Sequence, residues 1–300
     1  MNASSMLIKR NIKLFFKDKG MFFTSLITPA ILLVLYSTFL GKVYRDSFTA
    51  SLPDMFTLPD KIIDGLVGSQ LMSSILAVSC VTVAFCSNFL MVQDKPNGTI
   101  KDLRISPVKP SVLSLSYYIA SFVSTLIICF TATAFCLVYI AFVGWYMSVT
   151  DVLLLVVDVF LLVLFGTALS SLINLFLSTQ GQLSAVGTIV SAGYGFICGA
   201  YMPIYSFSEG LQKVIMFLPG TYGTSLVRNH SMGGVLAEMQ SEGVPEKVID
   251  SIRDSLDCNL YFFENQVNIS VMYVILGVAV AVLVGAYIIV NAFKKNVVSA

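Results

Sequence analysis

The chain has 300 residues, of which 56% are hydrophobic and 12% charged, with a net charge of +1 and a mean hydropathy of +0.84. This composition excludes a water-soluble globular domain and indicates a polytopic, all-α membrane protein. The near-neutral balance gives no indication of nucleic-acid binding.

Residues 6–19 predict an interfacial helix at the amino-terminal end. Its apolar face carries Ile8, Ile12, Phe15 and Phe16, and its basic face carries Lys9, Arg10, Lys13 and Lys17. The apolar face can lie in the headgroup boundary while the lysines meet anionic lipid. The apolar run that follows is as long as a full span and lacks a small-residue cleavage site, so we expect it to be retained.

Six membrane spans are predicted within one transmembrane domain, residues 1–300. They lie at about 21–40, 70–93, 112–143, 152–177, 183–202 and 269–293. The segments assigned to the cytosol, 1–20, 94–110, 178–182 and 294–300, hold 11 of the 18 lysines and arginines. The protein is expected in the cytoplasmic membrane. By the positive-inside rule, both of its termini are expected on the cytoplasmic side. No internal repeat is apparent, which disfavours a transporter built from inverted repeats.

The polar segment 94–110, DKPNGTIKDLRISPVKP, separates spans two and three. Asn97 and Gly98 are turn residues, the stretch from Thr99 has helical spacing, and two prolines end it. Basic residues outnumber acidic ones, as expected on the cytosolic side. The segment therefore predicts a short amphipathic helix at the cytosolic membrane surface.

This segment resembles the coupling helix of type-2 ATP-binding-cassette exporter permeases. The residues that carry the resemblance are Asp94, Lys95, Gly98, Thr99, Leu103, Ser106 and Pro107, with Asp94 where the family more usually has glutamate. The resemblance implies that this segment, including Arg104, couples to an ATPase. It also implies a dimer of permeases in the bilayer, each resting on a separate ATPase subunit that binds ATP and magnesium, while this chain binds no cofactor.

The loop 204–268 has two parts. Residues 207–228 are rather apolar but are broken at Leu218, Pro219 and Gly220, so each piece is too short to span; this pattern fits the re-entrant helical pair that the resemblance also implies before the last span. Residues 233–265 contain a predicted helix after Pro245 and are acidic, which predicts a small external cap.

Asp158 is the one carboxylate deep in a predicted span. Intramembrane charges are costly and are usually paired or functional. The turn near Trp145 and Tyr146 would bring Tyr139 to a similar depth, so a structural hydrogen bond is one interpretation. Exposure of Asp158 to the translocation path is the other.

Small residues recur every four positions in span five, at Gly187, Ser191, Gly195 and Gly199, and a shorter series lies at Gly277, Ala281 and Gly285. Such faces allow close helix packing, either within one chain or between two subunits. The family resemblance implies a cavity between the two subunits, which spans two and five would line. The substrate-path candidates are Asn88, Phe89, Tyr194, Phe196, Tyr201 and Met202.

Of the six cysteines, Cys258 alone lies outside the predicted spans, where a disulfide between two copies is conceivable. With His230 as the single histidine, neither a zinc site nor a Ser/His/Asp triad is expected. No GxxxxGK[ST] loop occurs, so the chain is not expected to hydrolyse ATP itself.

The sequence thus predicts the permease of an ATP-driven exporter whose apolar spans favour an amphipathic or lipophilic cargo, such as a drug, an antimicrobial peptide or a lipid. A permease for lipid-linked polysaccharide is the nearest alternative. An ion-coupled secondary transporter using Asp158 is a second, and a membrane sensor that binds its ligand at the acidic cap is a third.

Overall fold

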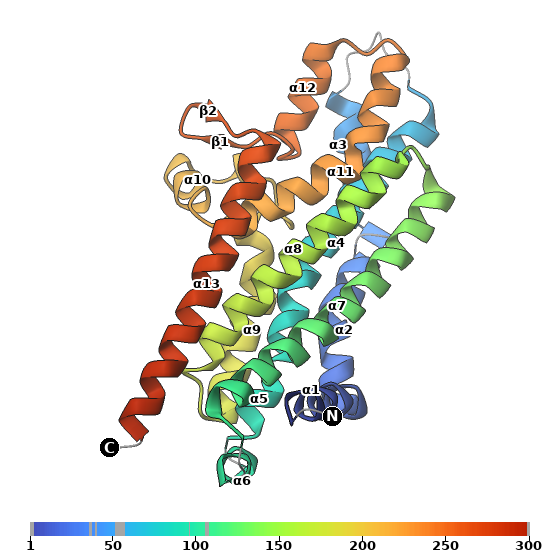
Figure 1. Cartoon of the computed structure of the whole chain (residues 1–300). Coiled ribbons are helices and arrows are strands. Elements are labelled where there is room, and N and C mark those ends of the chain that lie inside the picture. The colour runs from blue at the N-terminus through green and yellow to red at the C-terminus, as the bar shows by residue number, and fades with distance from the viewer. Residues whose placement is uncertain are drawn as a thin grey trace.

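The computed structural model is a bundle of helices and describes residues 3–35, 38–39, 41–51, 58–95, 97–105 and 108–298. Helix α1 (Ala3–Lys17) lies at one end, at 72° to α2 (Lys19–Leu35). The next helices are α3 (Gly41–Ser51), α4 (Asp60–Ser87), α5 (Phe89–Gln93), α6 (Thr99–Ile105), α7 (Pro110–Val143), α8 (Val149–Asn174) and α9 (Gln180–Ile197). Helices α7 and α8 form a hairpin around the turn at Trp145 and Tyr146, and α1 and α6 lie at the same end of the bundle (Figure 1).

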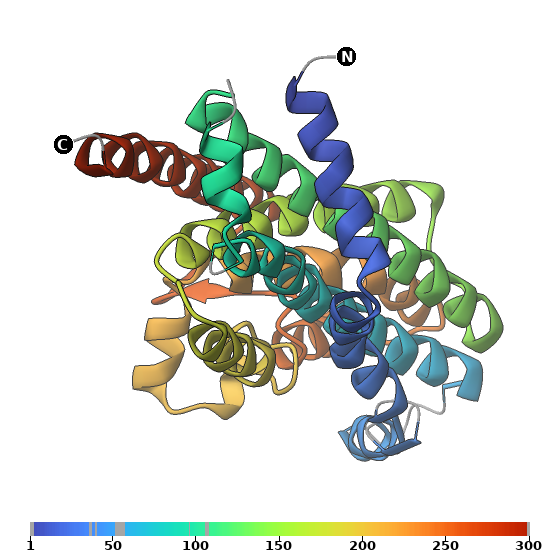
Figure 2. The same ribbon diagram turned by 90° about the horizontal axis from the view of Figure 1, so that it is seen from below.

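Helix α4 is the centre of the bundle. Almost every side chain from Ile62 to Ser87 is buried, and α4 contacts α2, α7, α8, α9 and α11, which surround it in Figure 2. Several of its buried hydroxyls donate to carbonyl groups of the preceding turn, among them Ser73 Oγ to Gln70 O at 2.7 Å and Ser79 Oγ to Ile75 O at 2.6 Å. Such bonds satisfy the hydroxyl donors of these serines inside an apolar bundle.

Gly166 allows α8 to approach α4 closely. A Cβ atom at this position would come within 2.8 Å of the carbonyl oxygen of Cys80. Any side chain would push the two helices apart, so this crossing depends on glycine.

The other end of the bundle is built by η2 (Ile204–Ser206), α10 (Glu209–Ile215), α11 (Pro219–Ser241), α12 (Glu246–Ser255) and the two-stranded hairpin β1 (Tyr261–Phe262) and β2 (Asn265–Gln266). The chain breaks between α10 and α11 next to the predicted position, and Pro219 opens α11. Helix α12 follows Pro245, as predicted. The last helix, α13 (Ile269–Val298), runs back along the bundle (Figure 1).

Two local predictions are wrong at this end. Helix α11 continues through Gly233 and Gly234, where the sequence analysis places a boundary. The reason is close packing, since a Cβ atom at Gly234 would meet the backbone of Tyr146 at 1.9 Å. The β1–β2 hairpin is also an addition to the predicted all-α fold, although it is only two residues deep.

Four helical stretches are long and apolar enough by themselves to cross a membrane: Asp60–Gln93, Ser111–Val143, Val149–Asn174 and Ile269–Asn291. The bent pair α1–α2 makes a fifth if it is counted as one span. The stretch predicted at 70–93 begins at Asp60, because α4 starts directly after Pro59 and carries charged residues in its first turns. Helices α2 and α9, where spans one and five are predicted, have 17 and 18 residues. The protein is a multi-pass helical membrane protein.

Candidate functional site

Asp94 joins three helices at the end of the bundle that carries α6. It follows α5, is 6% exposed, and its Oδ2 accepts hydrogen bonds from Tyr117 Oη of α7 at 2.5 Å and from Arg10 Nη1 of α1 at 3.1 Å. A carboxylate with a cationic and a phenolic donor is well satisfied in a partly dry site. The position predicted for coupling therefore connects α1, α5 and α7.

Lys95 makes a second connection, to the end of α8. Its Nζ donates to the carbonyl oxygens of Asn174 at 3.0 Å and Leu175 at 3.2 Å, and also to that of Leu177. The last carbonyl groups of a helix have no partner within the helix, and the negative end of the helix dipole attracts a cation. Lys95 thus caps α8 through its side chain.

Gly98 forms the turn between these two anchors and α6. Its φ of +78° lies in the left-handed region that favours glycine. Backbone bonds from Ile100 N to Asp94 O, 3.2 Å, and from Asp102 N to Gly98 O, 3.1 Å, close the turn in front of Thr99, the first residue of α6. Leu103 packs against the apolar cluster formed by Leu7, Met91, Leu113, Tyr117, Leu175 and Tyr287. Ser106, Pro107 and the side chain of Arg104 lie outside the described part of the chain.

The substrate-path candidate Asn88 is an interhelical contact in this subunit. It is 1% exposed, its Nδ2 donates to Ser170 Oγ at 2.5 Å, and its Oδ1 accepts from Ser171 Oγ at 3.2 Å. The neighbouring Phe89 packs against the apolar core near Gly187 of α9. The structure therefore brings α4 and α8 together through Asn88.

The small-residue face of α9 is largely covered by side chains of the same chain. The ring of Tyr201 lies against Gly195, where an added Cβ atom would meet it at 2.3 Å, and Tyr201 Oη donates to Ser191 O at 3.3 Å. Phe89 lies against Gly187. Of the other substrate-path candidates nearby, Phe196 packs edge-on against Tyr201 and is 49% exposed, Tyr194 is half-buried, and Met202 is 36% exposed. Within this chain, the glycines make room for side chains.

Gly277 and Gly285 differ from the glycines of α9. An added Cβ atom would meet no described atom within 4 Å at either position. This face of α13 is open in the single chain.

Asp158 is fully buried in α8 and bonds to two other helices. His230 Nδ1 of α11 lies 2.5 Å from its Oδ2, and Tyr273 Oη of α13 donates to its Oδ1 at 2.5 Å. The partner expected from the sequence, Tyr139, is wrong: that ring lies near Gly68 of α4. Neither partner is evident from the local sequence, although an intramembrane acid generally requires a base and His230 is the chain's single histidine.

Arg228 and Asp257 form a buried ion pair where α11 meets the loop after α12. Arg228 Nη1 donates to Asp257 Oδ2 at 2.9 Å, and its Nη2 to Gly199 O at 2.6 Å. Ile204 N donates to both carboxylate oxygens. Burial raises the pKa of Asp257, while Arg228 opposes that rise. The pair fixes the acidic cap to α11 and to the end of α9.

Cys258, next to Asp257, is 2% exposed and packs with Met232 in the core of the cap. Its carbonyl oxygen accepts from Ser225 Oγ at 3.0 Å and from Asn229 Nδ2 at 2.7 Å. A disulfide between two copies would require this thiol at the surface. The burial of Cys258 argues against that arrangement.

These features define a multi-pass helical membrane protein with polar junctions between its helices and, among the residues described, no group of three or more potential metal ligands. A comparison with protein-family models matches residues 3–230 to the ABC-2 type transporter family, and the chain belongs to that family. No match is found among curated proteins or solved structures. The chain is thus a transmembrane permease of an ABC-2 type transporter without an ATPase site of its own. Such permeases bind no cofactor and generally pair with an ATPase subunit.

Proposed function

We propose that the chain is the permease subunit of an ATP-driven exporter of amphipathic or lipophilic compounds, with six spans, both termini in the cytoplasm and two permeases per transporter. The segment 94–107 would receive the movement of the ATPase subunits and alternate a cavity between inward and outward access. The observation that carries this proposal is the double anchor of the segment, through Asp94 to α1 and α7 and through Lys95 to α8.

Because both anchors precede α6 directly, a displacement of α6 acts on three helices of the bundle at once. Helix α1 offers exposed Lys9, Lys13 and Lys17 beside this segment, which fits a cytosolic, anionic-lipid surface. Phe196 on α9 and Met202 in the bend after it are the exposed candidates for contact with cargo or with a second subunit. Asn88, which is buried, would act indirectly by holding α4 to α8.

The test uses the permease purified with its own ATPase subunit and reconstituted in vesicles, with the lipophilic dye Hoechst 33342 as the cargo probe. Changing Gly98, Leu103 and Arg104 to Val, Ala and Ala should lower ATP-dependent dye export at least tenfold while leaving membrane insertion intact. Lys247→Ala, an exposed change at the opposite end, is the control. Full export by the triple variant at normal expression would refute the coupling role.

A second candidate, ion-coupled transport, is favoured by one observation: the buried contact of Asp158 with His230 and Tyr273. It predicts transport that follows an imposed proton gradient without ATP. The same vesicles distinguish the two mechanisms. An ATP-driven exporter transports the dye when ATP is supplied and no proton gradient is imposed, whereas an ion-coupled transporter does not.

A further inference from the structure

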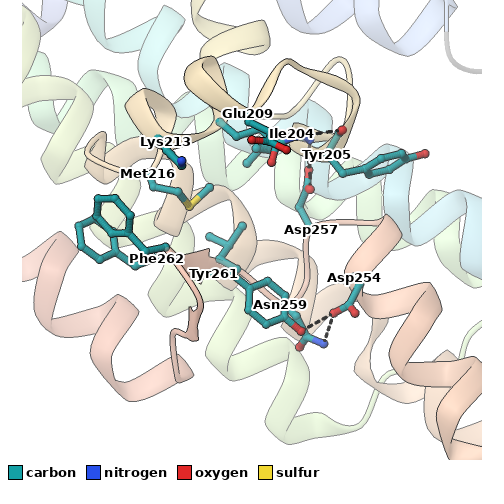
Figure 3. Close-up of a pocket in the computed structure, with 13 residues that line it drawn as sticks. Ile204, Tyr205, Glu209, Lys213, Met216, Asp254, Asp257, Asn259, Tyr261 and Phe262 are labelled. Atoms are coloured by element: carbon teal, nitrogen blue, oxygen red, sulfur yellow. Dashed lines mark hydrogen bonds between the residues drawn. The ribbon is translucent and has the colours of Figure 1, made fainter.

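A pocket of about 270 Å³ lies at the end of the bundle opposite α6. It is enclosed by η2, α10, the end of α12 and the β1–β2 hairpin (Figure 3). Its volume is close to the lower end of small-molecule sites, roughly 300 Å³. None of the residues that carry the proposed coupling lines it, so its chemistry requires a separate explanation.

Carboxylates dominate the charged lining. Asp254 is held by Asn259 Nδ2 at 2.8 Å and Tyr261 Oη at 3.0 Å, and both bonds go to Oδ1. Glu209 is exposed and has no hydrogen bond or ion pair with the described residues. Asp257 is neutralised by Arg228, and Lys213 contributes one ammonium group. Two carboxylates therefore stand against one cation in the described lining, and the pocket is negative.

Aromatic rings complete the wall. Tyr205 and Phe263 are 61% and 58% exposed, and Tyr261 is 43% exposed. Phe262 is fixed between Phe217 and Phe263 by edge-on contacts with centroid distances of 5.3 and 4.9 Å. The faces of such rings attract cations, and the attraction grows as water is excluded. Carboxylates and aromatic rings around one hollow are complementary to a cation that carries an apolar group.

The acidic cap around the pocket adds a long-range electrostatic attraction for cations. Between residues 233 and 265 it has the acidic side chains Glu238, Glu242, Glu246, Asp250, Asp254, Asp257 and Glu264, against Lys247 and Arg253. A field of one sign raises the local concentration of ions of the other sign. Cations are therefore drawn to the face on which the pocket opens.

We propose that this pocket is a binding site for small organic cations with an apolar group, such as substituted ammonium ions. The site is distinct from the proposed coupling segment and from the cavity between subunits. Binding at this site requires neither ATP nor a particular direction of transport. The site can therefore be confirmed even if the export function is refuted, and export can be confirmed even if this site is refuted.

Binding is measured on the full chain in detergent by titration calorimetry, with phenyltrimethylammonium as the probe and benzyl alcohol as a neutral aromatic comparison. We expect saturable binding of the cation alone. The double variant Glu209→Gln, Asp254→Asn should weaken binding at least tenfold, because it removes both charges while an amide at 254 still accepts the bonds of Asn259 and Tyr261. The matched control is Glu246→Gln, Asp250→Asn, on exposed positions of α12 outside the pocket, with less than a twofold change.

Tyr205→Leu provides the second measurement, with an expected loss of about threefold or more in affinity. If the aromatic residues serve only as anchors at the membrane interface, this variant binds the cation like the wild type. That result would overturn the proposal. Absence of saturable binding to the wild type, equal binding of benzyl alcohol, or equal losses in the pocket and control double variants would do the same.

Discussion

His230 Nδ1 lies 2.5 Å from Asp158 Oδ2, and both residues are buried, at 7% and 0% exposure. Tyr273 completes the contact, so one carboxylate joins α8, α11 and α13. In a membrane interior such a group is costly without partners. The pair therefore has a structural role whatever the protein transports, and it is the best place to separate stability from transport.

Asp158→Asn keeps the size of the side chain and its ability to accept from Tyr273 and to contact His230. We expect little change in thermal stability in detergent. Asp158→Leu should destabilise the protein by about 1–3 kcal/mol, because it leaves Tyr273 and His230 without a partner. Loss of all transport by the Asn variant at normal stability and assembly would instead support proton coupling.

Tyr117→Phe removes one of the two donors to Asp94 without changing the ring that packs in the core. A hydrogen bond to a charged acceptor contributes about 1.5–3 kcal/mol, so the melting temperature should fall measurably. The ATPase activity of the partner subunit should also change less when this permease variant is added than when the wild-type permease is added. Tyr118→Phe, at the adjacent position of α7, is the control; equal effects of both variants would contradict a specific role for the contact with Asp94.

Lys95→Met should loosen the end of α8. Without the ammonium group, the carbonyl oxygens of Asn174 and Leu175 lose their cationic donor, and the last helical turn frays. Hydrogen exchange measured by mass spectrometry should increase across residues 171–177 and stay unchanged in the first turns of α8. Lys109→Met changes the same type of side chain at the start of α7 and should have no effect there.

Gly195→Ala should destabilise the protein by about 1–3 kcal/mol, since the new Cβ atom meets the ring of Tyr201. Gly193→Ala, two residues away, introduces its Cβ where no described atom lies within 4 Å, and it should be close to neutral. In a Tyr201→Ala background, the cost of Gly195→Ala should largely disappear. A cost that persists there would point to a subunit contact at this face.

Cys258 should resist maleimide at pH 8 in the folded protein. The thiol is buried, and burial raises its pKa to about 12, so the reactive thiolate is scarce. Peptide mapping by mass spectrometry should find this residue labelled only after denaturation, and non-reducing gels should show no cross-linked dimer. If Cys258 in the folded protein were labelled as fast as an exposed cysteine, the packing described for the cap would be contradicted.

Helix positions were predictable where a long apolar run is bounded by turn residues, as in α7 between Pro110 and Gly144, and where a proline opens a helix, as at Pro219. The start of α4 was not, because Asp60, Lys61 and Asp64 look like loop residues although they lie in the first turns of a helix. The continuation of α11 was missed for a related reason. Gly233 and Gly234 resemble a helix end, whereas Gly234 serves close packing against Tyr146.

The polar contacts were less predictable than the helices. Asp94 and Lys95 are predicted from the resemblance to a coupling helix, and Asp158 from the need of a charge within an apolar run for partners. Their partners, Arg10, Tyr117, His230 and Tyr273, come from helices distant in sequence, and their identity depends on how the helices are arranged around α4. No local pattern contains that information, which is why Tyr139 was chosen wrongly for Asp158.

The guanidinium of Arg228 binds the carbonyl oxygen of Gly199 and the carboxylate of Asp257 at once. The carboxyl end of α9 and the acidic cap are thereby fastened to the same point of α11. A tilt of α9 would therefore act on the cap as well, unless the contacts of Arg228 are first broken, and breaking a buried charge pair costs several kcal/mol. The cap is therefore mechanically linked to α9, and a spectroscopic label at Glu264 in the cap would report the motion of that helix.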